Sequence, residues 1–320
     1  MMTFSSLSQI KRAISRAGAA AAMAAGLLVA GAHGAAADPI TLGSAASYGL
    51  LLGTNETLTS NGLHVGGNIG LSAGDKVNLS GSLNISGNAY VDGTPTVSGG
   101  GSYSVSGSIV TQSMTTIAAA AASASTTAGA LAANLTVAGN AINVNGSTNS
   151  IVIQAVTNAS ENVLNISSLS LTNGTITFDD NGYTNAKFII NVTGSFSMTN
   201  GAFMKGINGA SADDIIFNIE GTGTTVNLTG NSSTSIIGTI LAPQRNVNLG
   251  GGGNLTGALI AGVNNAGKSY TVNQAGGGYN ITSLGYTPRT SGPVPEPSSM
   301  ALFGVGFSAL VAARRRRQKR

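Results

Sequence analysis

Short runs of alternating apolar and polar residues recur through the middle of the chain. Residues 188–192, 215–219 and 226–229 each place an apolar side chain at every second position. A period of two residues is that of a β-strand, and Gly or Asn breaks each run after a few residues, so the pattern predicts many short strands. The predicted inward-facing side chains are Phe188, Ile190, Val192, Ile215, Phe217, Ile219, Val226 and Leu228. The same alternation predicts that Asn218 points outward, into solvent.

A six-residue phrase indicates how these strands are arranged. Val77-Asn-Leu-Ser-Gly-Ser is followed directly by Leu83-Asn-Ile-Ser-Gly-Asn, and related phrases begin at Val226 and Gly253. Each phrase supplies one or two inward apolar residues, outward Asn, Ser or Thr, and a Gly for the turn. Stacked units of this kind bury a continuous narrow core, which favours a β-solenoid over a β-sandwich. The phrase is too irregular to determine the handedness or the length of a turn.

One segment has a different pattern. Residues 115–134 contain five consecutive alanines, Ala118 to Ala122, and no proline. Alanine has the highest helix propensity, so we predict one α-helix here, whose small side chains let it lie close against a sheet.

The N-terminus has the three parts of a secretory signal peptide. Lys11, Arg12 and Arg16 precede an apolar run over 17–30, and small residues at 35–37 follow. We therefore expect a signal peptide over residues 1–37, cleaved after Ala37.

The C-terminus also has three parts in a fixed order. Val294, Pro295, Glu296 and Pro297 come first, an uncharged and largely apolar run from Met300 to Ala313 follows, and a basic stop closes it. The basic stop consists of Arg314, Arg315, Arg316 and Arg317. The apolar run is short for a full membrane span but suits a transient stop-transfer segment. A plain membrane tail is the alternative.

This order closely resembles the PEP-CTERM sorting signal of Gram-negative bacteria, also described as an ice-binding-protein C-terminal domain. The resemblance covers residues 294–320 and implies transient insertion into the inner membrane. It also implies cleavage near Pro295 by an exosortase, a membrane-embedded cysteine protease. Residues 287–293 contain two prolines and read as a linker between this signal and a domain over 38–286.

The domain carries a second resemblance. The runs Leu42–Gly53, Ile237–Pro243 and Leu255–Ala261 look like those of the choice-of-anchor A family of secreted bacterial surface domains. They are also similar to the bacterial ice-binding-protein family. That resemblance implies a mainly β protein, a right-handed β-solenoid or β-helix with an α-helix packed alongside. The Ala-rich segment falls where that family has its long helix.

Composition limits the chemistry of this chain. It has no Cys and two His, only 8% of its residues are charged, and 46 are Gly. Thiol nucleophiles, thiolate zinc sites and histidine triads are thereby excluded or nearly so, and we expect no catalytic residue, no cofactor and no enzyme activity. The basic residues concentrate at the two ends and the middle is mildly acidic, so we expect no nucleic-acid partner.

Two pairs of adjacent aspartates are the remaining candidates for a site. Asp179-Asp180-Asn181-Gly182 reads as a solvated turn, and Asp179, Asp180 and Asn181 are weak candidates for a calcium site. Asp213-Asp214 form the other pair. Polysaccharide-cleaving sites use clustered aspartates but also need His, Arg or Lys around the sugar, and between its two ends this chain has one His, His64, and few cations. We interpret His64 as an exposed strand residue and Gly250–Gly253 as a turn rather than a phosphate loop.

These observations predict an exported, non-enzymatic protein of the cell envelope or extracellular matrix, which an exosortase processes and which bears Asn, Ser and Thr on its faces. Such faces could hydrogen-bond exopolysaccharide or an ice surface, or could stay inert while the domain acts as a spacer, and the sequence does not name the ligand. Thr57-Leu-Thr59 and Thr175-Ile-Thr177 have the Thr-x-Thr form that suits an ice surface, but they do not recur at a constant spacing. A polysaccharide-active β-helix enzyme is a more distant alternative.

Overall fold

The computed structural model describes residues 40–157, 161–184, 186–264, 267–282 and 286–287. The expected signal peptide, the sorting signal and all but the first residue of the linker lie outside these residues. Within the described residues, no helix combines the length and apolar character needed to cross a membrane.

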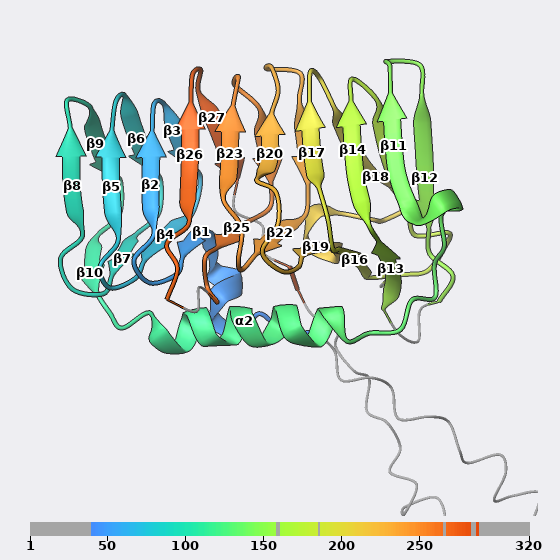
Figure 1. Ribbon diagram of the computed structural model, residues 1–320, viewed down its shortest axis with the longest axis horizontal. Helices are drawn as coiled ribbons and strands as arrows, with labels where there is room; N and C mark the ends of the chain where they lie inside the picture. The colour runs from blue at the N-terminus through green and yellow to red at the C-terminus, as the bar shows by residue number, and fades with distance from the viewer. Residues whose placement is uncertain (1–39, 158–160, 185, 265–266, 283–285, 288–320) are drawn as a thin grey trace, which may run out of the picture. The chain divides into compact units, whose positions relative to one another are not determined.

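Three parallel sheets of nine strands each wrap around one core, which confirms the predicted solenoid (Figure 1). In the order of pairing, sheet A consists of β10 (Ile109–Thr111), β7 (Ala89–Val91), β4 (Asn68–Leu71), β1 (Tyr48–Leu52), β25 (Leu259–Ala261), β22 (Thr239–Ala242), β19 (Ile215–Ile219), β16 (Phe188–Val192) and β13 (Asn162–Ile166).

Sheet B lies across the front of Figure 1, with all nine strands side by side. It consists of β11 (Ala141–Asn145), β14 (Ser168–Thr172), β17 (Phe196–Thr199), β20 (Val226–Thr229), β23 (Val247–Gly250), β26 (Thr271–Ala275), β2 (Thr57–Ser60), β5 (Lys76–Leu79) and β8 (Thr96–Gly99).

Sheet C forms the third side. It consists of β12 (Ser150–Gln154), β15 (Thr175–Asp179), β18 (Phe203–Ile207), β21 (Ser235–Ile237), β24 (Asn254–Thr256), β27 (Tyr279–Thr282), β3 (Leu63–Val65), β6 (Ser82–Ile85) and β9 (Ser102–Val105). The helical segments are η1 (Gly43–Ser47), α2 (Thr115–Gly129), η2 (Ala138–Asn140) and η3 (Ala212–Asp214).

The chain does not wind from one end of the solenoid to the other. It starts in the middle with β1, β2 and β3 and winds outward to β8, β9 and β10 at one end. Helix α2 then carries it back along sheet A, and β11 to β27 wind inward from the other end. The two windings meet where β25, β26 and β27 pair with β1, β2 and β3, for example at Leu50 with Leu259 and at Leu63 with Tyr279.

The interior confirms the predicted inward alternation. All eight side chains predicted to point inward belong to the main apolar core and are at most 1% exposed. Phe217, a fully buried member of this core, makes edge-to-face contacts with Phe178 and Phe196, with ring centroids 5.9 and 5.4 Å apart. This geometry is the favourable one for aromatic pairs.

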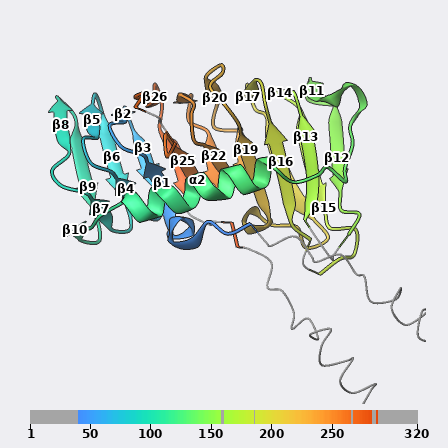
Figure 2. The ribbon, with the colours of Figure 1, turned by 60° about the horizontal axis from the view of Figure 1, so that its bottom comes forward.

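Helix α2 runs along the outer face of sheet A (Figure 2), and residues of the helix and the sheet form a second apolar cluster. Ala121, Ala124 and Ala128 of the helix pack there, against strand residues that include Ile189 and Ile216. Because alanine side chains are small, the helix axis can approach the sheet closely, as the composition of this segment predicts.

The prediction that Asn218 faces solvent is wrong. Its side chain points out of the core as the alternation predicts, but α2 covers that face of sheet A and Asn218 is 0% exposed. Its Nδ2 donates to the backbone oxygen of Ser125 at 3.1 Å and to Asn191 Oδ1 at 2.9 Å. The alternation identifies the outer side of a strand and does not show what packs on that side.

The helix is also shorter than predicted, because it ends at Gly129 rather than near residue 134. The backbone N–H groups of Asn134 and Leu135 donate instead to Val163 O, at 3.0 and 2.9 Å, at the edge of sheet A. A Cβ atom at Gly129 would lie 2.6 Å from Glu220 Oε1, so a glycine suits the end of the helix at this close approach.

Candidate binding faces

A solenoid with three sheets has three outward faces, and one of them is covered. Helix α2 lies along sheet A (Figure 2), and most of the outer apolar side chains of that sheet are buried. The outer faces of sheets B and C remain as the extended surfaces on which the described part of the chain can meet a large ligand.

The central line of outward residues on sheet B is polar at all nine strands. We call these nine residues the middle rank. In the order of pairing the middle rank is Asn143, Ser170, Ser197, Asn227, Asn248, Asn273, Thr59, Asn78 and Ser98.

Strand spacing makes the middle rank a regular array. Neighbouring strands lie about 4.8 Å apart, so nine strands extend the rank over about 38 Å. Asn248 Nδ2 donates to Asn227 Oδ1 at 3.2 Å, and Ser98 Oγ donates to Asn78 Oδ1 at 2.6 Å. These hydrogen bonds between strands hold the amides in a fixed orientation and leave each with further donors or acceptors for a ligand.

Charge is nearly absent from this face. Lys76 is the sole charged residue in the nine strands of sheet B, and it lies in a flanking line rather than in the middle rank. Thr172 and Thr199 form part of the line on the other side, with their hydroxyl oxygens 3.1 Å apart. The face thus offers neutral hydrogen-bonding groups at regular intervals and suits a neutral ligand rich in hydroxyl groups or water.

The face of sheet C is mixed. It carries a similar polar line through Asn254, Asn280, His64 and Asn84, in which Asn280 Nδ2 donates to Asn254 Oδ1 at 3.0 Å. Towards one end this line is interrupted by Phe203, which is 40% exposed. Exposed apolar and charged side chains, among them Val152 and Lys205, lie next to it. Sheet B is therefore the more uniform of the two faces.

The two Thr-x-Thr segments do not form one array. Thr57 and Thr59 lie on sheet B, whereas Thr175 and Thr177 lie on sheet C, and Thr177 is only 6% exposed. They belong to different faces of the solenoid, so they cannot contact one flat surface together.

The candidate calcium residues lie at the end of β15 and in the turn after it, but the prediction of a solvated turn is wrong for the two aspartates, because Asp179 and Asp180 are only 8% and 2% exposed. Asn181 and Gly182 both have positive φ, of 54° and 81°. Asp179 Oδ1 accepts from Asn181 N–H at 2.8 Å and from Asn208 Nδ2 at 2.7 Å. The hydrogen bond from Asn208 is the main reason that the pKa of Asp179 is lowered. In the described part of the chain no three His, Cys, Asp or Glu side chains come together in a way that could hold a metal ion.

Of the neighbouring carboxylates, Asp214 takes part in an ion pair and a helix cap, whereas Asp180 is buried and, among the described residues, no hydrogen-bond partner contacts its Oδ1. Asp214 Oδ1 pairs with Lys187 Nζ at 2.5 Å, and Asp214 also completes a capping box with Ser211 at η3. Asp180 is 2% exposed, and burial, followed by repulsion from Asp214, raises its pKa to about 6. His64 lies on a strand as predicted, but the prediction that it is exposed is wrong, because it is half-buried on sheet C with its Nε2 3.4 Å from Ser86 Oγ.

The sequence did not reveal the middle rank as a site, although its signal was present. The second position of the repeated phrase is Asn78, Asn84, Asn227 or Asn254. Asn78 and Asn227 lie in the middle rank of sheet B, and Asn84 and Asn254 lie in the polar line of sheet C. A position that is always Asn in the repeat therefore marks the outward polar lines, but the sequence did not show which phrases share a sheet.

Comparison with solved structures finds ice-binding proteins that are similar to this chain at low sequence identity. An ice-binding protein from the Antarctic ascomycete Antarctomyces psychrotrophicus is 18% identical, over 79% of this chain and 100% of that one, with a TM-score of 0.48. An ice-binding protein from an Antarctic Flavobacteriaceae bacterium is 21% identical, over 81% of this chain and 52% of that one, with a TM-score of 0.47. The ice-binding protein domain of Shewanella frigidimarina is 19% identical, over 75% and 97%, with a TM-score of 0.44.

Family models match two parts of the sequence, whereas no curated protein matches it. Residues 293–317 match the PEP-CTERM protein-sorting motif, in agreement with the resemblance of the C-terminal segment. Residues 31–284 match the model of an ice-binding-like adhesive domain, which is most of the chain. The chain therefore belongs to the family of ice-binding-like adhesive domains and carries a PEP-CTERM sorting motif behind that domain.

Proposed function

We propose that this protein is a non-enzymatic component of the cell envelope or extracellular matrix, exported and sorted by an exosortase, and that the middle rank of sheet B binds neutral exopolysaccharide. The observation that carries the proposal is the uncharged array of Asn, Ser and Thr across nine strands. Neutral sugars present hydroxyl groups that both donate and accept hydrogen bonds, as do the amides and hydroxyls of this face.

The sorting motif supports the first half of the proposal. A PEP-CTERM motif implies export and exosortase processing in Gram-negative bacteria, and here it begins at residue 293, a few residues after the matched domain ends at 284. The order of segments, with a basic cluster after the apolar run, suits transient insertion in the inner membrane before cleavage.

Ice is the second candidate ligand. The domain family and the folds of similar structures favour it. An ice surface calls for regularly spaced hydroxyls with methyl groups, and the middle rank contains Thr at one position of nine, Thr59. Amides and serine hydroxyls dominate it, which favours a hydroxyl-rich polymer over ice.

Binding is tested with a matched pair of variants. Asn248 and Asn254 lie on successive strands, β23 and β24, are both half-buried, and each pairs with another Asn. Asn248→Lys places a long cation in the middle rank and should weaken binding to purified host exopolysaccharide by about tenfold, or about 1.4 kcal/mol. Asn254→Lys, on sheet C, should leave binding unchanged. Equal loss in both variants would contradict the assignment to sheet B.

Two further measurements separate the alternatives. Thermal hysteresis or ice shaping at micromolar concentration, without exopolysaccharide binding, would favour the ice-binding function. Intact-mass measurement of the secreted protein, from hosts with and without the exosortase, tests the sorting step. The expected species begins near Asp38 and lacks Arg314 to Arg320, and a secreted species that keeps these arginines would contradict processing.

A further inference from the structure

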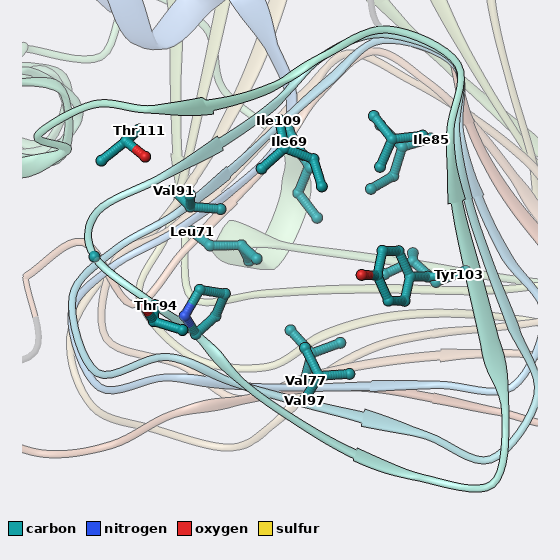
Figure 3. A pocket seen from close by; sticks show the side chains of 15 residues that line it. Ile69, Leu71, Val77, Ile85, Val91, Thr94, Val97, Tyr103, Ile109 and Thr111 are labelled. Atoms are coloured by element: carbon teal, nitrogen blue, oxygen red, sulfur yellow. The ribbon is translucent and has the colours of Figure 1, made fainter.

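One end of the solenoid exposes its core. The last turn consists of β8, β9 and β10, which we call the open rung. Its inward side chains Val97, Tyr103 and Ile109 are 48%, 55% and 60% exposed. They line a cavity of about 380 Å³ whose other walls include Leu71 and Ile85 (Figure 3). The fold directs these apolar side chains inward, yet they remain in contact with solvent. Burying them against a partner would therefore stabilise the protein.

The opposite end is closed. There the inward residues Ile142, Ile153 and Leu164 are 1%, 4% and 1% exposed. The segment after α2 covers them, because Leu135 forms a β-bridge with Leu164 and belongs to the same core cluster. The two ends of the solenoid therefore differ, and a head-to-tail stack would not bury apolar surface on both partners.

The open rung also has unpaired strand edges. β8, β9 and β10 are each the last strand of their sheet, so within the described residues one edge of each has no neighbouring strand. Proteins usually protect such edges with charged side chains, above all Lys, and residues 93–113 contain no Asp, Glu, Lys or Arg. Such an uncharged edge can form backbone hydrogen bonds with a strand of a partner, which would extend the sheet by one strand.

We propose that the open rung is a dimer interface, occupied by the open rung of a second copy of this chain. An uncharged end can face its own copy without like-charge repulsion. A two-fold axis perpendicular to the solenoid axis sets the facing edges antiparallel, which is a normal ladder, and closes the assembly at two copies. The three edge strands are only three or four residues long, so the interface is small and the dimer is weak. A weak dimer can still form when many copies of the protein are concentrated in the envelope or matrix.

The chain's own tail is a less suitable occupant. Thr287 is tied to the far half of sheet A, because its N–H donates to Asp213 O at 3.0 Å and its Oγ1 accepts from Lys187 Nζ at 3.2 Å. Asp213 adjoins β19, which is six strands from β10 and therefore about 29 Å away. Under the proposed processing, the apolar part of the tail is also removed on export.

Single-cysteine variants test the interface in the full chain, expressed in its host without the wild-type copy. The natural sequence has no Cys, so any disulfide between copies reports the introduced position. Ser98→Cys, Ser104→Cys and Thr111→Cys place exposed thiols on the three strands of the open rung, and Ser150→Cys places one on the edge strand β12 at the closed end. We expect disulfide-linked or maleimide-linked dimers from at least one variant of the open rung and only background from Ser150→Cys.

A second set of variants tests whether the apolar face holds the dimer together. Tyr103→Lys, combined with the cross-linking cysteine, should reduce the linked fraction to the Ser150→Cys background with little change in melting temperature. Val152→Lys is the matched control, because Val152 is also 55% exposed but lies at the closed end, and it should change neither. Cross-linking that is equal at both ends, that survives Tyr103→Lys, or that is absent at every open-rung position would overturn the proposal. Ser104→Cys and Thr111→Cys lie outside the middle rank, so a failure of cross-linking at these two positions would leave the polysaccharide proposal intact.

Discussion

Ser125 Oγ donates a hydrogen bond to Asn218 Oδ1 at 2.6 Å, between residues that are 93 positions apart in the chain. Ser125 lies on the buried side of α2 and Asn218 on the outer face of β19. The amide of Asn218 continues a ladder through Asn191 to Asn165, whose Nδ2 donates to Leu131 O just after the helix. Polar side chains therefore attach the C-terminal half of α2 to sheet A within an otherwise apolar contact.

Asn218→Asp should destabilise the domain by about 3 kcal/mol. The substitution removes the Nδ2 donor to Ser125 O and Asn191 Oδ1 and places a carboxylate in a buried site without a cation. Asn227→Asp is the matched control, because Asn227 is half-exposed in the middle rank and acts there as an acceptor. It should cost less than about 0.5 kcal/mol. Urea unfolding measures both, and equal costs would contradict the burial of Asn218.

Phe217→Asp should cost at least about 4 kcal/mol, enough to unfold a marginal domain. It removes the ring that contacts Phe178 and Phe196 and leaves a buried charge without a partner. Phe217→Leu keeps an apolar side chain there and should cost about 1–2 kcal/mol. Circular dichroism melts compare the two variants. A folded Phe217→Asp protein with an unchanged melting temperature would mean that the core is not packed as described.

Asp75 should make the domain less stable as the pH rises. Burial, aided by repulsion from Glu56, raises its pKa to about 8, although its carboxylate accepts N–H bonds from Glu56 and Ser72. Between about pH 4 and pH 8 the folded protein therefore keeps a proton on Asp75 that the unfolded chain has already released. The free energy of unfolding falls with rising pH in this range and levels off above it. Asp180, with a pKa of about 6, contributes in the same direction only at the lower end.

The range from about pH 6.5 to pH 8 therefore reports mainly on Asp75. Asp75→Asn cannot titrate, so the slope of stability against pH should be reduced there, although the variant is less stable overall because an amide offers only one acceptor. Melting temperatures of both proteins across this range test the assignment. An identical slope in the variant would assign the pH dependence to other groups.

Arg245→Lys should destabilise the domain by about 3 kcal/mol. Arg245 is 1% exposed, and its guanidinium donates to the backbone oxygens of Gly221, Thr224 and Thr193 at 2.7, 3.0 and 3.0 Å. The planar guanidinium of Arg245 directs N–H donors to several sides. The compact ammonium group of a lysine could not reach all of these carbonyl oxygens at once, so some would lose their partner. Lys205→Arg, at an exposed position, is the control and should change stability by less than about 0.5 kcal/mol. Equal thermal melts for Arg245→Lys and the wild type would contradict this account.

Local pattern was enough to predict much of the fold. Alternation identified the inward residues from Phe188 to Leu228, because a strand directs successive side chains to opposite sides whatever its neighbours are. The alanine run predicted a helix at the place where α2 begins, because helix propensity is a property of the residues themselves. Hydropathy and charge order along the chain predicted a short stop-transfer segment, and the resemblance of the tripartite tail to the PEP-CTERM signal agrees with the matched sorting motif.

Pairing over long distances was decided only by the tertiary structure. Nothing in the local pattern shows that β1 lies between β4 and β25, that the chain starts in the middle of the solenoid, or that the polar residues of nine strands form one line. The burial of Asn218 and Arg245 depends in the same way on segments far away in sequence. A period of two residues defines the two sides of a strand, but only the packing of distant segments determines which side meets water, a helix, or a second molecule.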